Sequence, residues 1–89
     1  MIFLITLEEA IYVAEMLNID FKNFTLEDFK TGLNIELEHG KANSKTNVTN
    51  DDLLLTGKIA LAHLNEFPNY YNSEYGLPMF EKFLKQKLK

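Results

Sequence analysis

Two pairs, each of a glutamate and a histidine, have the residue types and the spacing that metal binding or acid–base chemistry would need. Glu36 and His39 lie three positions apart in the stretch ELEHG, and His63 and Glu66 have the same spacing in HLNE. On a helix this spacing puts both side chains on one flank, as in the bundles that bring carboxylate and imidazole ligands to a di-metal centre. The pattern therefore suggests a divalent-metal site.

Two aspartates belong to the same candidate site. Asp51 and Asp52 follow a short polar connection after His39, so an antiparallel helical hairpin would put them level with that histidine. In such a hairpin His63 lies about 12 residues, roughly 18 Å, farther along the axis, away from Glu36. Oxygen ligands with one imidazole fit a divalent cation weakly, and no calcium-loop pattern is present. The full set of candidate metal ligands is Glu36, His39, Asp51, Asp52, His63 and Glu66.

Structural roles explain the same residues without a metal. Asp51 and Asp52 suit a helix start, where the dipole stabilises negative charge, and a protonated His39 suits a helix end. A Glu/His pair can also act as general acid and base, but catalysis needs a pocket and a charge-stabilising group, and neither is recognisable here. We therefore expect no catalytic residues and no cofactor, with the divalent metal as the alternative.

The spacing of apolar residues predicts that helices carry these side chains. Thr6 and Thr25 each precede an acid by three positions, so both resemble capping boxes that start a helix. The second of these helices is expected over residues 26–39, with Gly40 as its stop. A third is expected over residues 51–67, with Thr49 or Asn50 as its cap.

The third predicted helix is apolar on two sides. Leu55, Ile59 and Ala62 lie opposite its main apolar face. A helix of this kind is typically buried in the middle of a bundle. We therefore expect the chain itself or a second chain to cover both sides.

The remaining segments complete a bundle of four or five helices. Pro68 and Gly76 are expected to bound a short helix, and an amphipathic last helix, expected to dock on the surface, begins at Pro78. Residues 2–5 are expected to form an extended edge segment. The predicted fold class is all-α, a compact single domain over residues 1–89, which is also what the length allows.

Composition excludes several classes of function. Residues 1–81 contain 5 lysines and 13 acids, a net charge of −8, whereas residues 82–89 contain 4 lysines and no acid. The acidic body and the absence of arginine argue against general nucleic-acid binding. No apolar run approaches the ~20 residues that span a bilayer, and no cysteine is present, so we expect a cytoplasmic protein without a membrane partner.

A partner that is another protein, or a second copy of the chain, fits the remaining features best. The sequence has a helix that is apolar on two sides and a group of tyrosines, which commonly anchor interfaces. We therefore expect a small non-catalytic binding or regulatory module. The predicted interface residues are Leu55, Ile59, Tyr70, Tyr71 and Tyr75.

Two stretches resemble an uncharacterised family of small bacterial and phage-encoded proteins. They are GLNIELEHG and TNVTNDDLLLTGKIALAHLNEFPNYY, and the likeness covers roughly residues 17–71. The resemblance implies no activity, and it suggests a phage or prophage origin. The positions that carry it are Glu36, Glu38, His39, Gly40, Asp51, Asp52, Lys58, His63, Glu66, Pro68, Tyr70 and Tyr71.

Overall fold

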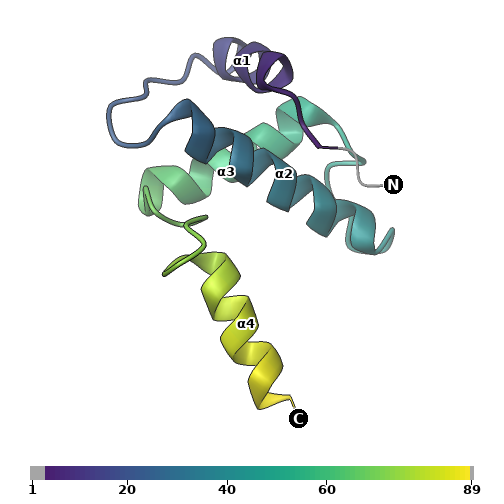
Figure 1. The fold of residues 1–89 in the computed structure, drawn as a ribbon. Helices are drawn as coiled ribbons and strands as arrows, with labels where there is room; N and C mark the ends of the chain where they lie inside the picture. Colours follow the sequence, from purple (N-terminus) through teal and green to yellow (C-terminus); the bar gives the residue numbers. More distant parts are fainter. Residues whose placement is uncertain (1–3, 89) are drawn as a thin grey trace.

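The chain folds into helices joined by turns, as a computed structural model covering residues 4–88 describes (Figure 1). Residues 4–88 contain no strand, so the predicted all-α single-domain class is confirmed. Residues 2 and 3 of the predicted edge segment lie outside the described range, and Leu4 and Ile5 are not in a strand. The helices are α1 (Leu7–Met16), α2 (Leu26–Ala42), α3 (Leu53–Glu66) and α4 (Leu77–Lys87).

The first two helices begin where the sequence predicts. The Thr6 hydroxyl accepts the backbone N–H of Glu9 at 3.1 Å, and the Glu9 carboxylate accepts that of Thr6 at 2.9 Å. Thr25 and Asp28 form the same reciprocal pair at the start of α2. Each pair satisfies two backbone donors that a helix start otherwise leaves without a partner, so both predicted capping boxes are confirmed.

The cap predicted for α3 at Thr49 or Asn50 is wrong. Asn50 and Asp51 both have positive φ angles, 51° and 64°, so the chain is not yet helical there. Asp52 is the cap instead, and its side chain accepts the backbone N–H of Leu55 at 3.0 Å. Asp51 therefore lies outside the helix rather than in its first turn.

The stop predicted for α2 at Gly40 is also wrong. None of the glycines has a positive φ, and α2 continues through Gly40 to Ala42. A Cβ atom at Gly40 would lie 3.0 Å from the Oδ1 atom of Asn47. The absence of a side chain at Gly40 therefore lets the following connection pack closely against α2.

Residues 67–76 form turns, so the short helix predicted for residues 68–76 is wrong. Gly76 accordingly ends no helix and is instead the N-cap of α4. Its N–H donates to the carbonyl of Asn72 at 2.8 Å, and a Cβ atom there would collide with the backbone of Tyr70 and Asn72. This tight turn sets the point from which α4 leaves the body of the protein.

Helices α1, α2 and α3 enclose the core. α3 crosses α2, α1 lies across them on one side, and α4 extends away on the other (Figure 1). Gly57 allows α1 and α3 to approach, because a Cβ atom there would lie 2.5 Å from Cγ1 of Val13. The buried apolar residues are Ile5, Ala10, Val13, Ala14, Phe24, Phe29, Leu33, Leu37, Ala60, Leu64 and Tyr71.

The docking predicted for the last helix is wrong, and within residues 4–88 the chain itself does not cover the second face of α3. α4 does not dock its apolar side on the body: it has no buried residue, and Phe80, Phe83 and Leu84 are 64%, 52% and 59% exposed. On the second face of α3, Leu55 and Ala62 are exposed and Ile59 is only half-buried. Coverage of that face of α3 by a second chain stays a prediction.

None of the helices described within residues 4–88 combines the length and apolar content needed to cross a membrane.

Candidate functional site

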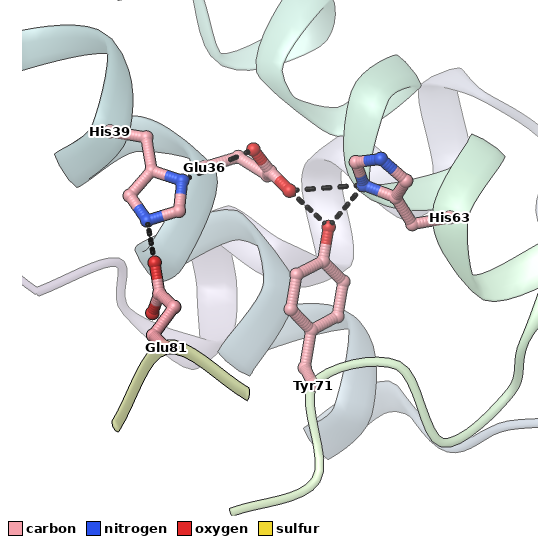
Figure 2. Close-up of polar contacts among 5 residues, drawn as sticks. All are labelled: Glu36, His39, His63, Tyr71 and Glu81. Atoms are coloured by element: carbon pink, nitrogen blue, oxygen red, sulfur yellow. Dashed lines mark hydrogen bonds and ion pairs between the residues drawn. The ribbon is translucent and has the colours of Figure 1, made fainter. Parts of the chain in front are cut away.

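One carboxylate oxygen joins three elements of the fold. The Oε2 atom of Glu36, on α2, accepts the hydroxyl of Tyr71 at 2.5 Å and lies 3.0 Å from Nδ1 of His63, on α3 (Figure 2). The Tyr71 oxygen is also 3.0 Å from that nitrogen. We call these three residues the polar cluster. It links α2 and α3 to the turns that lead to α4.

The meeting of Glu36 and His63 corrects the sequence-based placement of the two pairs. The predicted separation along the axis assumed that α2 ends at His39 and that α3 returns beside it in register. In the structure α2 continues to Ala42, and residues 43–52 form a connection long enough for α3 to cross α2. The crossing brings the side chains within hydrogen-bond distance.

Tyr71 reaches the cluster from within the core. Its side chain is almost completely buried, with only 4% of its surface exposed. Gly32 on α2 makes this position available, because a Cβ atom there would lie 2.5 Å from Cε2 of the tyrosine ring. A glycine on one helix therefore decides how deeply a tyrosine from a distant turn can insert.

The surroundings of Tyr71 keep it a hydrogen-bond donor. Burial raises the pKa of its phenol, and the hydrogen bond to Glu36 and the charge of that carboxylate raise it further. Burial also raises the pKa of Tyr70, followed by the nearby charges of Glu36, Glu81 and Glu66. Both phenols are therefore neutral at physiological pH.

The hydrogen bonds define the tautomer of a neutral His63. The only hydroxyl proton of Tyr71 goes to Glu36, so both oxygens near Nδ1 of His63 act as acceptors and Nδ1 carries the hydrogen. The imidazole also stacks on the ring of Tyr70, with centroids 4.3 Å apart and planes 9° from parallel. These contacts fix the ring, and Nε2 takes no part in the cluster.

A second contact connects the site to α4. His39 Nε2 lies 3.2 Å from Oε2 of Glu81, and His39 Nδ1 lies 3.9 Å from Oε1 of Glu36 (Figure 2). Sequence reasoning missed Glu81, although it is the only acidic residue in the lysine-rich last helix. It also missed the glycine at position 32, whose role depends on a contact between distant segments.

The other predicted ligands have local roles. The carboxylate of Asp51 accepts the side-chain amide of Asn47 at 2.8 Å, Asp52 caps α3, and Glu66 is exposed at the end of that helix. Within residues 4–88, no three or more His, Cys, Asp or Glu side chains are placed to hold a metal ion. Of the predicted interface residues, Leu55 and Tyr75 are exposed, Ile59 and Tyr70 are half-buried, and Tyr71 is buried.

The depression beside the cluster is small. Its volume is about 220 Å³, against about 300–1,000 Å³ for typical small-molecule sites. Across residues 4–88, every buried side-chain nitrogen and oxygen has a hydrogen-bond partner within the protein, so no unpaired buried polar atom marks a ligand site. The arrangement is therefore best suited to fixing the turns at residues 67–76 against α2 and α3. The residues lining the depression are Glu36, His39, Gly40, Thr46, Val48, Thr49 and Ile59.

Comparison with known proteins places the chain in a family without assigning it a function. The family model described as "Protein of unknown function (DUF5661)" matches residues 10–77. The chain belongs to this family. The DUF5661 match extends beyond the predicted range of residues 17–71 and includes the whole polar cluster, but it ends at the first residue of α4. No curated protein and no solved structure matches this DUF5661 chain.

Proposed function

We propose that the protein is a small non-catalytic binding module whose partner is a protein, and that α4 presents its binding surface. One observation carries the proposal: α4 exposes Met79, Phe80, Phe83 and Leu84, whereas Leu77 in its first turn packs against the core. Contiguous apolar patches of several hundred Å² seldom remain bare in soluble proteins. The α4 surface consists of Phe67, Tyr75, Met79, Phe80, Phe83 and Leu84, all of which are exposed.

The base of α4 offers a place for an anchoring side chain. A groove of about 410 Å³ lies between the turns and the first residues of α4. Phe67, Tyr70, Tyr75 and Phe80 are among the residues that line it. Aromatic side chains around a groove are typical of the centre of a protein interface.

The length of α4 also favours a bound partner. The helix has 11 residues, and isolated helices shorter than about 12–15 residues are only marginally stable in water. Inside this chain it gains support mainly from its first turn and from the His39–Glu81 contact. A partner that covers the α4 surface supplies the tertiary packing that the chain itself does not.

Site-specific photo-crosslinking tests this function in cells. A benzophenone amino acid is placed at Phe83 in the α4 surface, and, as a control, at exposed Glu38 on α2. The expected result is a discrete protein adduct from position 83 that is absent from position 38 and is identified by mass spectrometry. Equal labelling at the two positions, or none at 83, would contradict the proposal.

Divalent-metal binding is the alternative function. It is favoured only by the proximity of Glu36, His39 and His63. Metal analysis of protein purified without chelator, with melting curves in the presence of manganese, iron or zinc, separates the two functions. A stoichiometric metal ion and a raised melting temperature would replace the present proposal.

A cytoplasmic location and a phage or prophage origin complete the proposal. They are supported by the cysteine-free composition and by the resemblance described above. Cell fractionation tests the location, and the genes on either side of the coding sequence test the origin.

A further inference from the structure

The α4 surface has a complementary counterpart on the same chain. Resting on the function proposed above, we infer that α4 binds the exposed face of α1 in a second copy of this protein. That face, called here the acidic α1 face, consists of Glu8, Ile11, Tyr12 and Glu15, all of which are exposed.

The helix α4, which we infer to bind, is both basic and apolar. Lys82, Lys85 and Lys87 surround the apolar residues of α4, and the ammonium of Lys87 lies 5.4 Å from the centre of the Phe83 ring. Glu81, the only acid in α4, is already engaged with His39. The exposed charges beside Met79, Phe80, Phe83 and Leu84 are therefore those of lysines, whereas exposed Glu66 and Glu74 lie next to Phe67 and Tyr75 in the sequence.

The receiving side has the opposite charge and its own apolar residues. α1 contains three glutamates and no basic residue. Beside it lies a depression of about 410 Å³ that Ile11, Glu15 and Phe21 line. An apolar side chain from α4 has a place to insert there, and a lysine beside it has a carboxylate to pair with.

The geometry of one chain prevents this contact from forming internally. α1 and α4 lie on opposite sides of the α2–α3 pair (Figure 1). The helix contacts agree, since α1 packs on α2 and α3, whereas the backbone of α4 approaches none of the three helices closely and its link to α2 is the His39–Glu81 side-chain contact. Only the α1 of another molecule is therefore available to α4.

Charge also favours a second copy of the protein over other possible partners of the α4 surface. Residues 1–81 carry 5 lysines and 13 acids, so the body of the protein is attracted to α4 of another molecule and repelled by an anionic membrane. Pairing α4 with α4 would bring lysines from both copies together, which disfavours that arrangement. When α4 of each copy binds α1 of the other, both surfaces are covered and the assembly closes as a symmetric dimer.

Charge-reversal rescue tests the inference on the full chain. Sedimentation velocity measures dimerisation of the wild type, of Glu8→Lys with Glu15→Lys, of Lys82→Glu with Lys85→Glu, and of the combination. We expect a wild-type dimer, at least about tenfold weaker association in each double variant, equivalent to about 1.4 kcal/mol, and recovery in the combination. Glu38→Lys, an exposed charge reversal on α2, is the control and is expected to dimerise normally.

Each other outcome overturns the inference in a recognisable way. Circular dichroism first establishes that every variant is helical. A dimer that survives the α1 substitutions but is lost in Phe83→Ser would show α4–α4 pairing instead. A monomer that binds phosphatidylglycerol vesicles through α4 would show a membrane surface instead. A monomer whose position 83 crosslinks to a different protein would leave the proposed function intact, whereas a monomer without an adduct would remove both.

Discussion

At the scale of single residues, the carboxylate of Glu36 determines how three segments meet. Its side chain is only 10% exposed, and one of its oxygens receives both the Tyr71 hydroxyl and the His63 imidazole. Hydrogen bonds to a charged, poorly solvated acceptor contribute more to stability than those between neutral groups. The cluster is therefore expected to stabilise the fold measurably even though it has no catalytic role.

Replacing Tyr71 with Phe tests this contribution. The change keeps the buried ring and removes the donor, so the carboxylate loses one of its two close partners, and the free energy of unfolding is expected to fall by about 1–3 kcal/mol. Urea unfolding measures it. Glu38→Gln, at an exposed position on α2 outside both proposed binding surfaces, is the control and is expected to change stability by less than about 0.5 kcal/mol.

The same variant carries a pH dependence whose sign follows from the raised pKa of Tyr71. The unfolded phenol ionises near pH ~10, but the folded one ionises only at higher pH. The fold thus favours the protonated phenol, and this contribution is complete below about pH 10 and is lost as pH rises further. Between about pH 8 and 11 the wild type should lose more stability than Tyr71→Phe. Equal losses would contradict the burial of the hydroxyl.

At the scale of helices, starts were predicted from the sequence better than ends or crossings. Thr6 and Thr25 signal their helices through bonds to residues three positions away, and such local chemistry is readable in sequence. A glycine at position 40 is typical of a helix end, but the helix continues through it. The close contact with Asn47 is what accounts for glycine there. The meaning of a glycine depends on what packs against it, which the local sequence does not contain.

The candidate site was predicted only in its parts. Glu36, His39 and His63 were recognised from their spacing, and two of them meet with Tyr71 in the cluster. Their actual distances depend on the crossing of α2 and α3, which is set by packing around Gly32 and Gly57 and by the length of the connection. These are contacts between distant segments, so periodicity along one helix could not predict them.

The approach of α1 to α3 yields a prediction at this scale. Gly57→Ala puts a methyl group 2.5 Å from Val13 Cγ1 and 3.1 Å from Leu17 Cδ1, and Val13 is fully buried. Overpacking of this kind costs typically about 1–3 kcal/mol, whereas alanine gains about 1 kcal/mol in helix propensity. We expect net destabilisation, measured as a lower melting temperature.

Gly40→Ala is the matched comparison for this variant. It makes the same change inside α2, but the nearest atom is the end of the half-buried Asn47 side chain at 3.0 Å. Its cost should be smaller than that of Gly57→Ala. If the two variants melt alike, close helix contact is not what position 57 provides.

At the scale of the whole molecule, the protein divides into a packed body and a projecting helix. Within residues 4–88 the buried residues all lie between Ile5 and Gly76, and the family match ends at residue 77. The core and the shared family region therefore end together, just where α4 begins. The lysine-rich helix is an addition to a body that already encloses its own core.

Truncation after Leu77 tests this division. The shortened chain keeps the core and the polar cluster. It loses mostly exposed side chains and the partly exposed His39–Glu81 pair. An ion pair of this kind contributes about 0–1 kcal/mol. We expect its melting temperature to remain within a few degrees of full-length Lys82→Glu with Lys85→Glu, measured at a concentration at which sedimentation velocity shows that variant to be monomeric. Comparison with that monomer matters because a dimer gains stability from association itself. Loss of the cooperative transition would instead show that α4 contributes to folding of the body, and the exposed α4 surface would then need an explanation other than binding.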